Sequence, residues 1–204
     1  MKGLYMLILK RVATLVLSGM FVVGGAYADS SIDSDGLTRN LKVTEYGGMV
    51  GYGQGNLERG YYRNVFLIWH LAADLKHYTG LKEKHGQLSA FIEPQINPVI
   101  DPTQNIEFGI GFGLQYMYPL MNTFSPYVMG SVGPHYISAK TDDTGQARGF
   151  AFASTIGIGL YYFIDRQWAL NLGYRLRHIS NANMNSPDGS INTQNILMGL
   201  SLCF

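Results

Sequence analysis

Three side chains near the C-terminus are suited to acyl transfer: His178, Ser180 and Asn181. A serine hydroxyl attacks an ester carbonyl when an adjacent base removes its proton, and a neutral imidazole is suited to that task. A neighbouring side-chain amide can donate a hydrogen bond to the oxyanion that forms, which predicts this role for Asn181. The His-x-Ser spacing is a weak signal by itself, because a polar strand end leaving a membrane would also account for it.

The residues before this cluster predict the strand that positions it. Bulky apolar residues occupy every second position from Trp168 to Leu176. Small or polar residues occupy the alternate positions, from Ala169 to Arg177. Because successive side chains of a strand point to opposite faces, His178 and Ser180 continue the apolar face. Residues two apart on one face lie about 7 Å apart at Cα, a gap that side chains can close to hydrogen-bonding distance.

The same alternation recurs along the chain and predicts an all-β fold. It is clearest from Ile106 to Tyr118, where bulky apolar residues at even positions face glycine, glutamate and glutamine at odd ones. Pro94 interrupts one of the other segments and predicts a bulge there. Eight segments follow the pattern: 44–53, 64–74, 87–96, 106–118, 127–137, 150–162, 168–177 and 194–204.

The two faces of these segments indicate what surrounds the sheet. One face carries Phe, Tyr, Leu and Ile, whereas the opposite face is mostly Gly, Ala, Ser, Asn, Gln, Glu and Arg. An eight-stranded barrel has an interior just wide enough for side chains, so the small and polar face fits inside and the bulky apolar face requires lipid. We therefore expect an eight-stranded antiparallel transmembrane β-barrel. A soluble, lipocalin-like barrel that binds lipid is the alternative.

Strand order predicts where the connections lie. With the N-terminus in the periplasm, the connections 54–63, 97–105, 138–149 and 178–193 would all be extracellular. The segment from Leu75 to Gly86 is longer than a periplasmic turn should be.

The first 28 residues have the pattern of a signal peptide. Lys2, Lys10 and Arg11 precede an apolar run, and Ala26-Tyr27-Ala28 matches an A-x-A cleavage site. Cleavage would leave residues 29–204 as a single outer-membrane barrel domain. Loss of those three cations would change the formal net charge from +1 to about −2, which argues against a nucleic-acid partner.

The remaining polar residues predict a stabilised interior and no cofactor. Arg175 and Arg177 fall on the inner face, where Glu93, Glu107 or Gln115 would pair with them. The other histidines show no metal-ligand spacing with cysteines or carboxylates, and Cys203 is the only cysteine, so neither a metal nor a disulfide is expected. The sequence leaves the oligomeric state open between monomer and homodimer.

The run from His178 to Ala182, followed by Pro187-Asp188-Gly189 and a last alternating strand, resembles the lipid A 3-O-deacylase family of outer-membrane barrels. The specific part of the resemblance covers residues 175–204. It implies an outward-facing pair in which His178 is the base and Ser180 the nucleophile. It also matches Asn181 to the asparagine that follows the serine in that family.

The chain departs from the family pattern at the residue that orients the histidine. The best-studied family members carry a glutamate fourteen residues after the histidine, where this chain has Asn192. An amide oxygen also accepts a hydrogen bond from an imidazole, although it stabilises an imidazolium less than a carboxylate does. Asp188, the carboxylate of this connection, is the alternative orienting residue. Asn183 and Asp188 stand where the family has a glycine and an asparagine associated with the oxyanion.

The resemblance implies an outer-membrane esterase that removes an ester-linked 3-O-acyl chain from the lipid A of lipopolysaccharide, without a cofactor. Two other functions stay open at this point: a non-catalytic small outer-membrane barrel, and an outer-membrane phospholipase that uses the same pair of residues.

Overall fold

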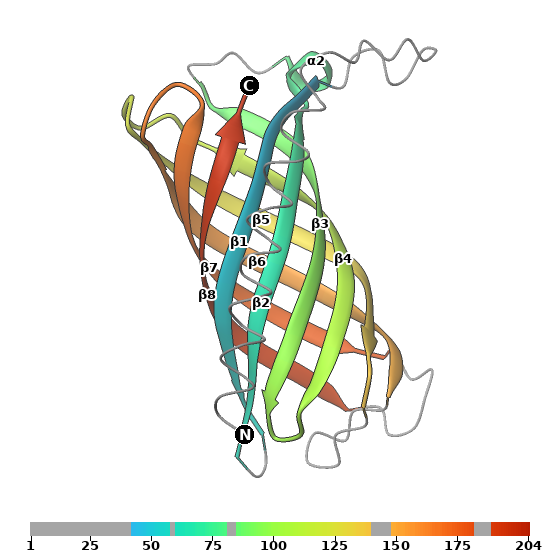
Figure 1. The fold of residues 1–204 in the computed structure, drawn as a ribbon. Helices are drawn as coiled ribbons and strands as arrows, with labels where there is room; N and C mark the ends of the chain where they lie inside the picture. The colour runs from blue at the N-terminus through green and yellow to red at the C-terminus, as the bar shows by residue number, and fades with distance from the viewer. Residues whose placement is uncertain (1–41, 58–59, 81–84, 140–147, 182–188) are drawn as a thin grey trace. The chain divides into compact units, whose positions relative to one another are not determined.

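The computed structural model describes residues 42–57, 60–80, 85–139, 148–181 and 189–204. Within them, eight antiparallel strands form a closed barrel in which each strand pairs with the next and β8 pairs with β1 (Figure 1). The predicted fold class is thus confirmed. The predicted signal peptide lies outside the described residues. The strands are β1 (Lys42–Asn56), β2 (Tyr61–Asp74), β3 (Gln87–Asp101), β4 (Asn105–Met117), β5 (Phe124–Ile137), β6 (Gly149–Phe163), β7 (Trp168–Ser180) and β8 (Ser190–Cys203).

The strands are 13 to 15 residues long, which exceeds most of the predicted segments. The hydrogen-bonded ladder continues beyond the point where the alternation of apolar and polar residues fades. The extension matters most in β7, which ends at Ser180 rather than at Arg177. His178 and Ser180 therefore lie within the strand, held by its ladder, and not in the connection that follows.

The predicted bulge at Pro94 is wrong. Pro94 pairs with Ile110 in an unbroken register between β3 and β4, and its side chain is exposed on the outer face. The ladder irregularities lie instead between Val43 and Glu45 in β1, and between Arg63 and Asn64 in β2.

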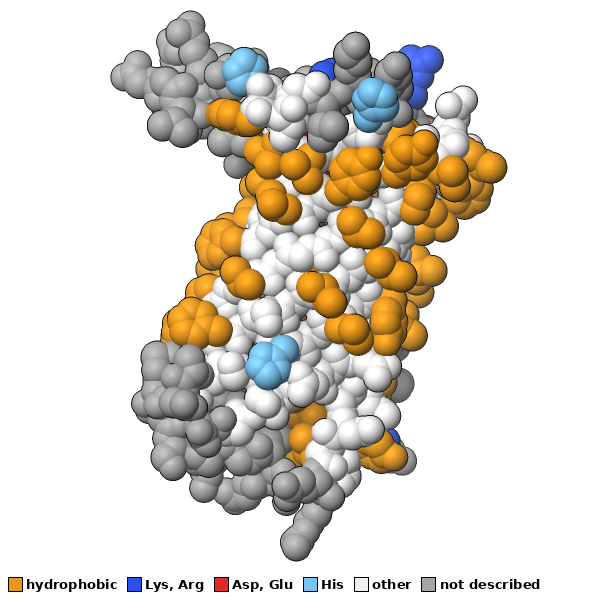
Figure 2. Space-filling view, turned by 180° about the vertical axis from the view of Figure 1, so that it is seen from behind, with side chains coloured by type: hydrophobic (Ala, Val, Ile, Leu, Met, Phe, Trp, Pro, Cys, Tyr) orange, Lys and Arg blue, Asp and Glu red, His pale blue; other side chains and the backbone are white. Residues whose placement is uncertain are grey.

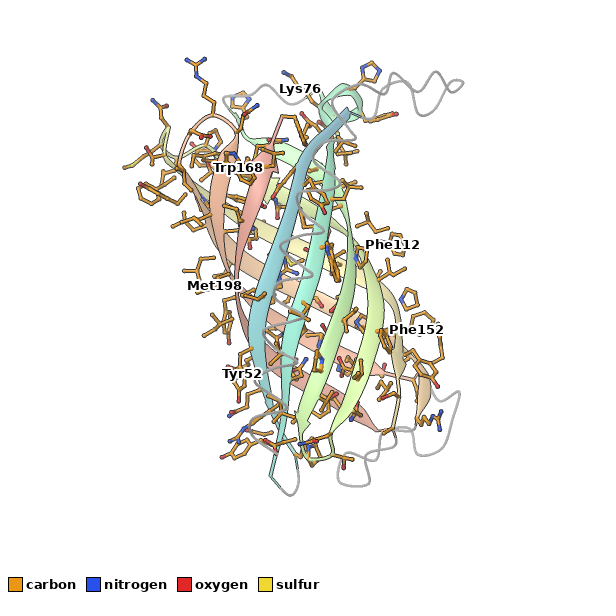
Figure 3. The ribbon with its side chains drawn as sticks, in the orientation of Figure 1. Tyr52, Lys76, Phe112, Phe152, Trp168 and Met198 are labelled. Atoms are coloured by element: carbon orange, nitrogen blue, oxygen red, sulfur yellow. The ribbon has the colours of Figure 1, made fainter. Side chains whose placement is uncertain are left out.

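The outer wall of the barrel is apolar. Phe112, Phe152 and Met198 point away from the wall (Figure 3), with exposed fractions of 51%, 46% and 62%. Figure 2 shows many apolar side chains spread over one side of the barrel. Side chains of this kind are stable on an outer surface only when hydrocarbon, not water, surrounds it, so the wall is a membrane-facing surface.

The inside of the barrel holds paired charges, as the sequence predicts. Arg175 donates two hydrogen bonds to Glu93, at 2.6 and 2.9 Å, and the carboxylate also lies 2.8 Å from Nδ1 of His70. Arg177 donates a 2.7 Å hydrogen bond to Glu107. Because Arg175 and Arg177 belong to β7, these ion pairs tie the strand that carries His178 on its outer face to β3 and β4 across the barrel interior.

Two connections explain how the strands reverse at one end of the barrel. In the turn between β6 and β7, Oδ1 of Asp165 accepts hydrogen bonds from the backbone N–H groups of Trp168 and Gln167, both at 2.7 Å. These bonds lower the pKa of the Asp165 carboxyl. The long connection between β2 and β3 holds a short helix, α2 (Lys76–Thr79), which ends at Gly80 with a left-handed φ of 63°.

Within the described residues, no helix has the length and apolar character needed to cross a membrane.

Candidate active site

The candidate site lies on the outer face of three neighbouring strands. In β7, the side chain of His178 is exposed, whereas its neighbours Arg177 and Ile179 are buried on the inner side. The strand register places Ser154 of β6 directly opposite His178 on one side and Asn192 of β8 directly opposite on the other. The imidazole therefore stands between two outward-facing polar side chains.

Asn192 contacts the imidazole directly. Its Oδ1 lies 2.7 Å from Nδ1 of His178, so the amide oxygen accepts a hydrogen bond from Nδ1–H. This tautomer leaves Nε2 without a proton and able to accept one from a hydroxyl. Asn192 comes fourteen residues after His178 in the sequence, on the next strand, and the β7–β8 register brings the two side chains together. The alternative orienting residue, Asp188, lies outside the described residues.

Ser180 shares the outer face of β7 with His178. Its side chain is partly exposed, and the register places it between Phe152 of β6 and Ser190 of β8. The two-residue spacing puts its Cα about 7 Å from that of His178. Base-assisted attack would require a rotation of the Ser180 side chain that brings its hydroxyl to Nε2 of His178.

Asn181 continues the inward set of β7, and its side chain is only 1% exposed. Its amide group thus lies on the opposite side of the barrel wall from the hydroxyl of Ser180. The oxyanion role of this residue stays a prediction.

A groove of about 620 Å³ crosses β6, β7, β8 and the end of β1. His178 and Asn192 line it, and polar side chains from the other strands extend it across the wall. Its polar lining residues are Gln54, Asn56, Ser154, Thr155, His178, Asn192 and Gln194, together with Arg177. Arg177 is buried and bound to Glu107, so the groove is lined mainly by amides and hydroxyls rather than by free charges.

Sequence reasoning missed Gln54, Ser154 and Gln194 as parts of this groove. A signal for Ser154 was present, because it interrupts the outward apolar series of β6 between Phe152 and Ile156. The register was needed to show that this interruption faces His178. Among the described residues, no group of three or more His, Cys, Asp or Glu side chains is arranged to hold a metal ion.

A closed eight-stranded barrel with an apolar outer wall is the architecture of an integral outer-membrane protein. The sequence model of the family described as lipid A 3-O-deacylase (PagL) matches residues 48–201, which is most of the barrel. The chain belongs to this family and is a protein of the outer membrane.

Solved structures agree with this fold. The crystal structure of the outer membrane enzyme PagL aligns with a TM-score of 0.55 at 15% identity, covering 76% of this chain and 97% of that one. Neisserial surface protein A also aligns with a TM-score of 0.55, at 12% identity, covering 78% and 96%. At such identities the likeness concerns the fold alone. No curated protein matches the sequence significantly.

Proposed function

We propose that this chain hydrolyses the ester that links the 3-O-acyl chain to lipid A, with Ser180 as nucleophile and His178 as general base. One observation carries the proposal: the imidazole of His178 is held by Asn192 at 2.7 Å on the lipid-facing wall, with Ser180 two residues further along the same face. A base, the group that orients it and a nucleophile are thereby present on one face.

The reaction would proceed in two steps. Oγ of Ser180 bonds to the ester carbonyl carbon while its proton passes to Nε2 of His178, and the carbonyl electron pair moves onto the oxygen. Collapse of this oxyanion breaks the bond to the sugar oxygen, which takes the proton from His178. Water, deprotonated by His178, then attacks the acyl-serine and releases the fatty acid and free Ser180. Water is the other reactant, so the reaction requires no cofactor.

The position of the site suits a substrate that stays in the membrane. The acyl chains of lipid A lie in the outer leaflet, beside a wall whose outward residues include Phe152 and Leu176 on either side of the site. The sugar to which the ester is attached would meet the amides and hydroxyls of the groove. An ester at the boundary between chains and sugar can therefore reach Ser180 without leaving the bilayer.

We infer that the site end of the barrel, which carries the connections after β1, β3, β5 and β7, faces the cell exterior. This orientation places the site in the leaflet that contains lipid A.

The test is a comparison of lipid products from purified protein folded in mixed micelles. Lipid A and glycerophospholipid are supplied together, and released fatty acids and remaining lipids are identified by mass spectrometry. The proposal predicts loss of one ester-linked acyl chain from lipid A alone, and no loss with Ser180→Ala. Cleavage of the phospholipid would make the chain a phospholipase, and no cleavage of either lipid by folded protein would make it a non-catalytic barrel.

A further inference from the structure

Ser154 of β6 faces the same imidazole as Asn192 does, but from the opposite side. The register pairs Ser154 with His178, and directly opposed residues of an antiparallel pair have Cβ atoms about 4.5–5.5 Å apart. Both side chains are exposed on the outer face and both line the groove. Ser180 is not among the described lining residues of that groove. A second hydroxyl therefore lies at least as close to the imidazole along the wall as the predicted nucleophile does.

The hydrogen bond to Asn192 determines which edge of the imidazole faces Ser154. Nδ1 is directed toward β8, where Asn192 lies. The two nitrogens sit on different edges of the ring, so Nε2 is directed away from β8. The proton transfers between Ser180, His178 and substrate thus occur on the side of the histidine where Ser154 stands.

The oxyanion that forms when Ser180 attacks would also need a hydrogen-bond donor on the outer face. The side-chain amide of Asn181 is buried on the inner side of the wall. Oxyanion sites of acyl-transfer enzymes combine several donors directed at the same oxygen. Ser154 supplies a hydroxyl on the required face, two residue pairs away from Ser180 along the β6–β7 ladder.

The spacing fits a carbonyl group bound between the two serines. Diagonal neighbours on adjacent strands, such as Ser154 and Ser180, lie about 7–8 Å apart. A nucleophile about 3 Å from the carbonyl carbon attacks at an obtuse angle to the C=O bond, whose oxygen then accepts a hydrogen bond of about 2.8 Å. The two serine oxygens would therefore be roughly 5–6 Å apart, which side chains can reach when their Cα atoms are about 7–8 Å apart. In this arrangement the carbonyl carbon lies next to the hydroxyl of Ser180, and the carbonyl oxygen is directed at the hydroxyl of Ser154.

We propose that Ser154 is a catalytic residue that donates a hydrogen bond from its hydroxyl to the oxyanion formed when Ser180 attacks the ester. The inference rests on the function proposed above and extends it to a residue of β6. In the first step the carbonyl electron pair moves onto oxygen, and the hydroxyl proton of Ser154 stays on Ser154 while it stabilises that charge.

The experiment measures kcat and KM for fatty-acid release from lipid A in mixed micelles, for Ser154→Ala, Ser154→Thr and the unsubstituted chain. Ser190→Ala is the matched control, because Ser190 is an exposed serine of the same face, opposite Ser180 on β8. Heat-modifiable electrophoretic mobility confirms that each barrel is folded. We expect Ser154→Ala to lower kcat about 10²-fold with KM nearly unchanged, since an oxyanion donor acts in the transition state. Threonine, which keeps the hydroxyl and suits a strand, should restore most of kcat.

Each contrary outcome is distinct. An unchanged kcat in Ser154→Ala would overturn this inference and leave the Ser180 assignment intact. A raised KM with unchanged kcat would reduce Ser154 to a substrate-binding residue. An inactive Ser154→Ala beside an active Ser180→Ala would make Ser154 the nucleophile and overturn both assignments. Inactivity of the unsubstituted folded chain on lipid A would refute the proposed function and this inference with it.

Discussion

Replacing Asn192 by aspartate should increase the rate of deacylation. The two side chains have the same shape, so the 2.7 Å contact with Nδ1 of His178 is preserved. A neutral hydrogen bond contributes about 1 kcal/mol, whereas one to a charged group contributes about 1.5–3 kcal/mol. The aspartate would stabilise the imidazolium formed in the transition state by an additional 1–2 kcal/mol, about 5- to 30-fold in kcat.

A second effect acts in the same direction. An amide can present either its oxygen or its NH₂ group to Nδ1, and the NH₂ arrangement leaves the proton on Nε2, where His178 cannot act as a base. A carboxylate offers acceptors in both positions and so favours the productive tautomer. Asn192→Ala, which removes the acceptor, should instead lower kcat by about 5-fold.

The assay is the initial rate of fatty-acid release from lipid A by folded protein at neutral pH. Gln194→Glu is the control, because Gln194 is exposed on the same face two residues away and acquires the same charge without the contact to His178. An increase in Asn192→Asp that exceeds the effect of Gln194→Glu is expected. A folded Asn192→Asp variant with unchanged or lower kcat would refute the orienting role of Asn192.

Three further predictions concern the barrel. Arg175→Ala leaves the buried Glu93 without its main partner, and should lower the free energy of unfolding by about 3–5 kcal/mol in urea titrations followed by electrophoretic mobility. A similar midpoint to the unsubstituted protein would contradict that pairing. Phe112→Arg places a cation on the lipid-facing wall and should lower the free energy of unfolding by up to about 2–4 kcal/mol in the same titration. Tyr78→Arg in α2 is the control and should lower it little. Equal losses in the two variants would argue against a membrane-facing wall. N-terminal sequencing of protein from outer membranes should begin at Asp29, and a sequence beginning at Met1 would exclude cleavage.

The fold was predictable because lipid and the barrel interior select for opposite kinds of side chain at alternating positions. The series from Ile106 to Tyr116 shows this contrast without interruption. The inner face of β2 is less clear, since Phe66 and Ile68 point inward and pack with Met49 and Leu197. An interior that accepts apolar as well as polar side chains weakens the alternation. The ends of the strands were not predicted for a similar reason.

The candidate site was predictable only where its residues are close in sequence. His178 and Ser180 lie on one face of one strand, so counting along β7 is sufficient. The contact of His178 with Asn192 depends on the β7–β8 register, which the family offset of fourteen residues indicated and local pattern did not. Ser154 lies 24 residues before His178, and no local spacing relates the two. The register of β6 against β7 places them together.

The most direct test of the central claim is covalent labelling of the nucleophile. Folded protein is treated with a lipophilic fluorophosphonate, which reacts with serines activated by an adjacent base, and the modified peptide is identified by mass spectrometry. Modification of Ser180 in the unsubstituted chain, and its loss in His178→Ala, is the predicted result. No modification of Ser180 in a folded barrel, or the same extent of modification without His178, would contradict the assignment of these two residues as nucleophile and base.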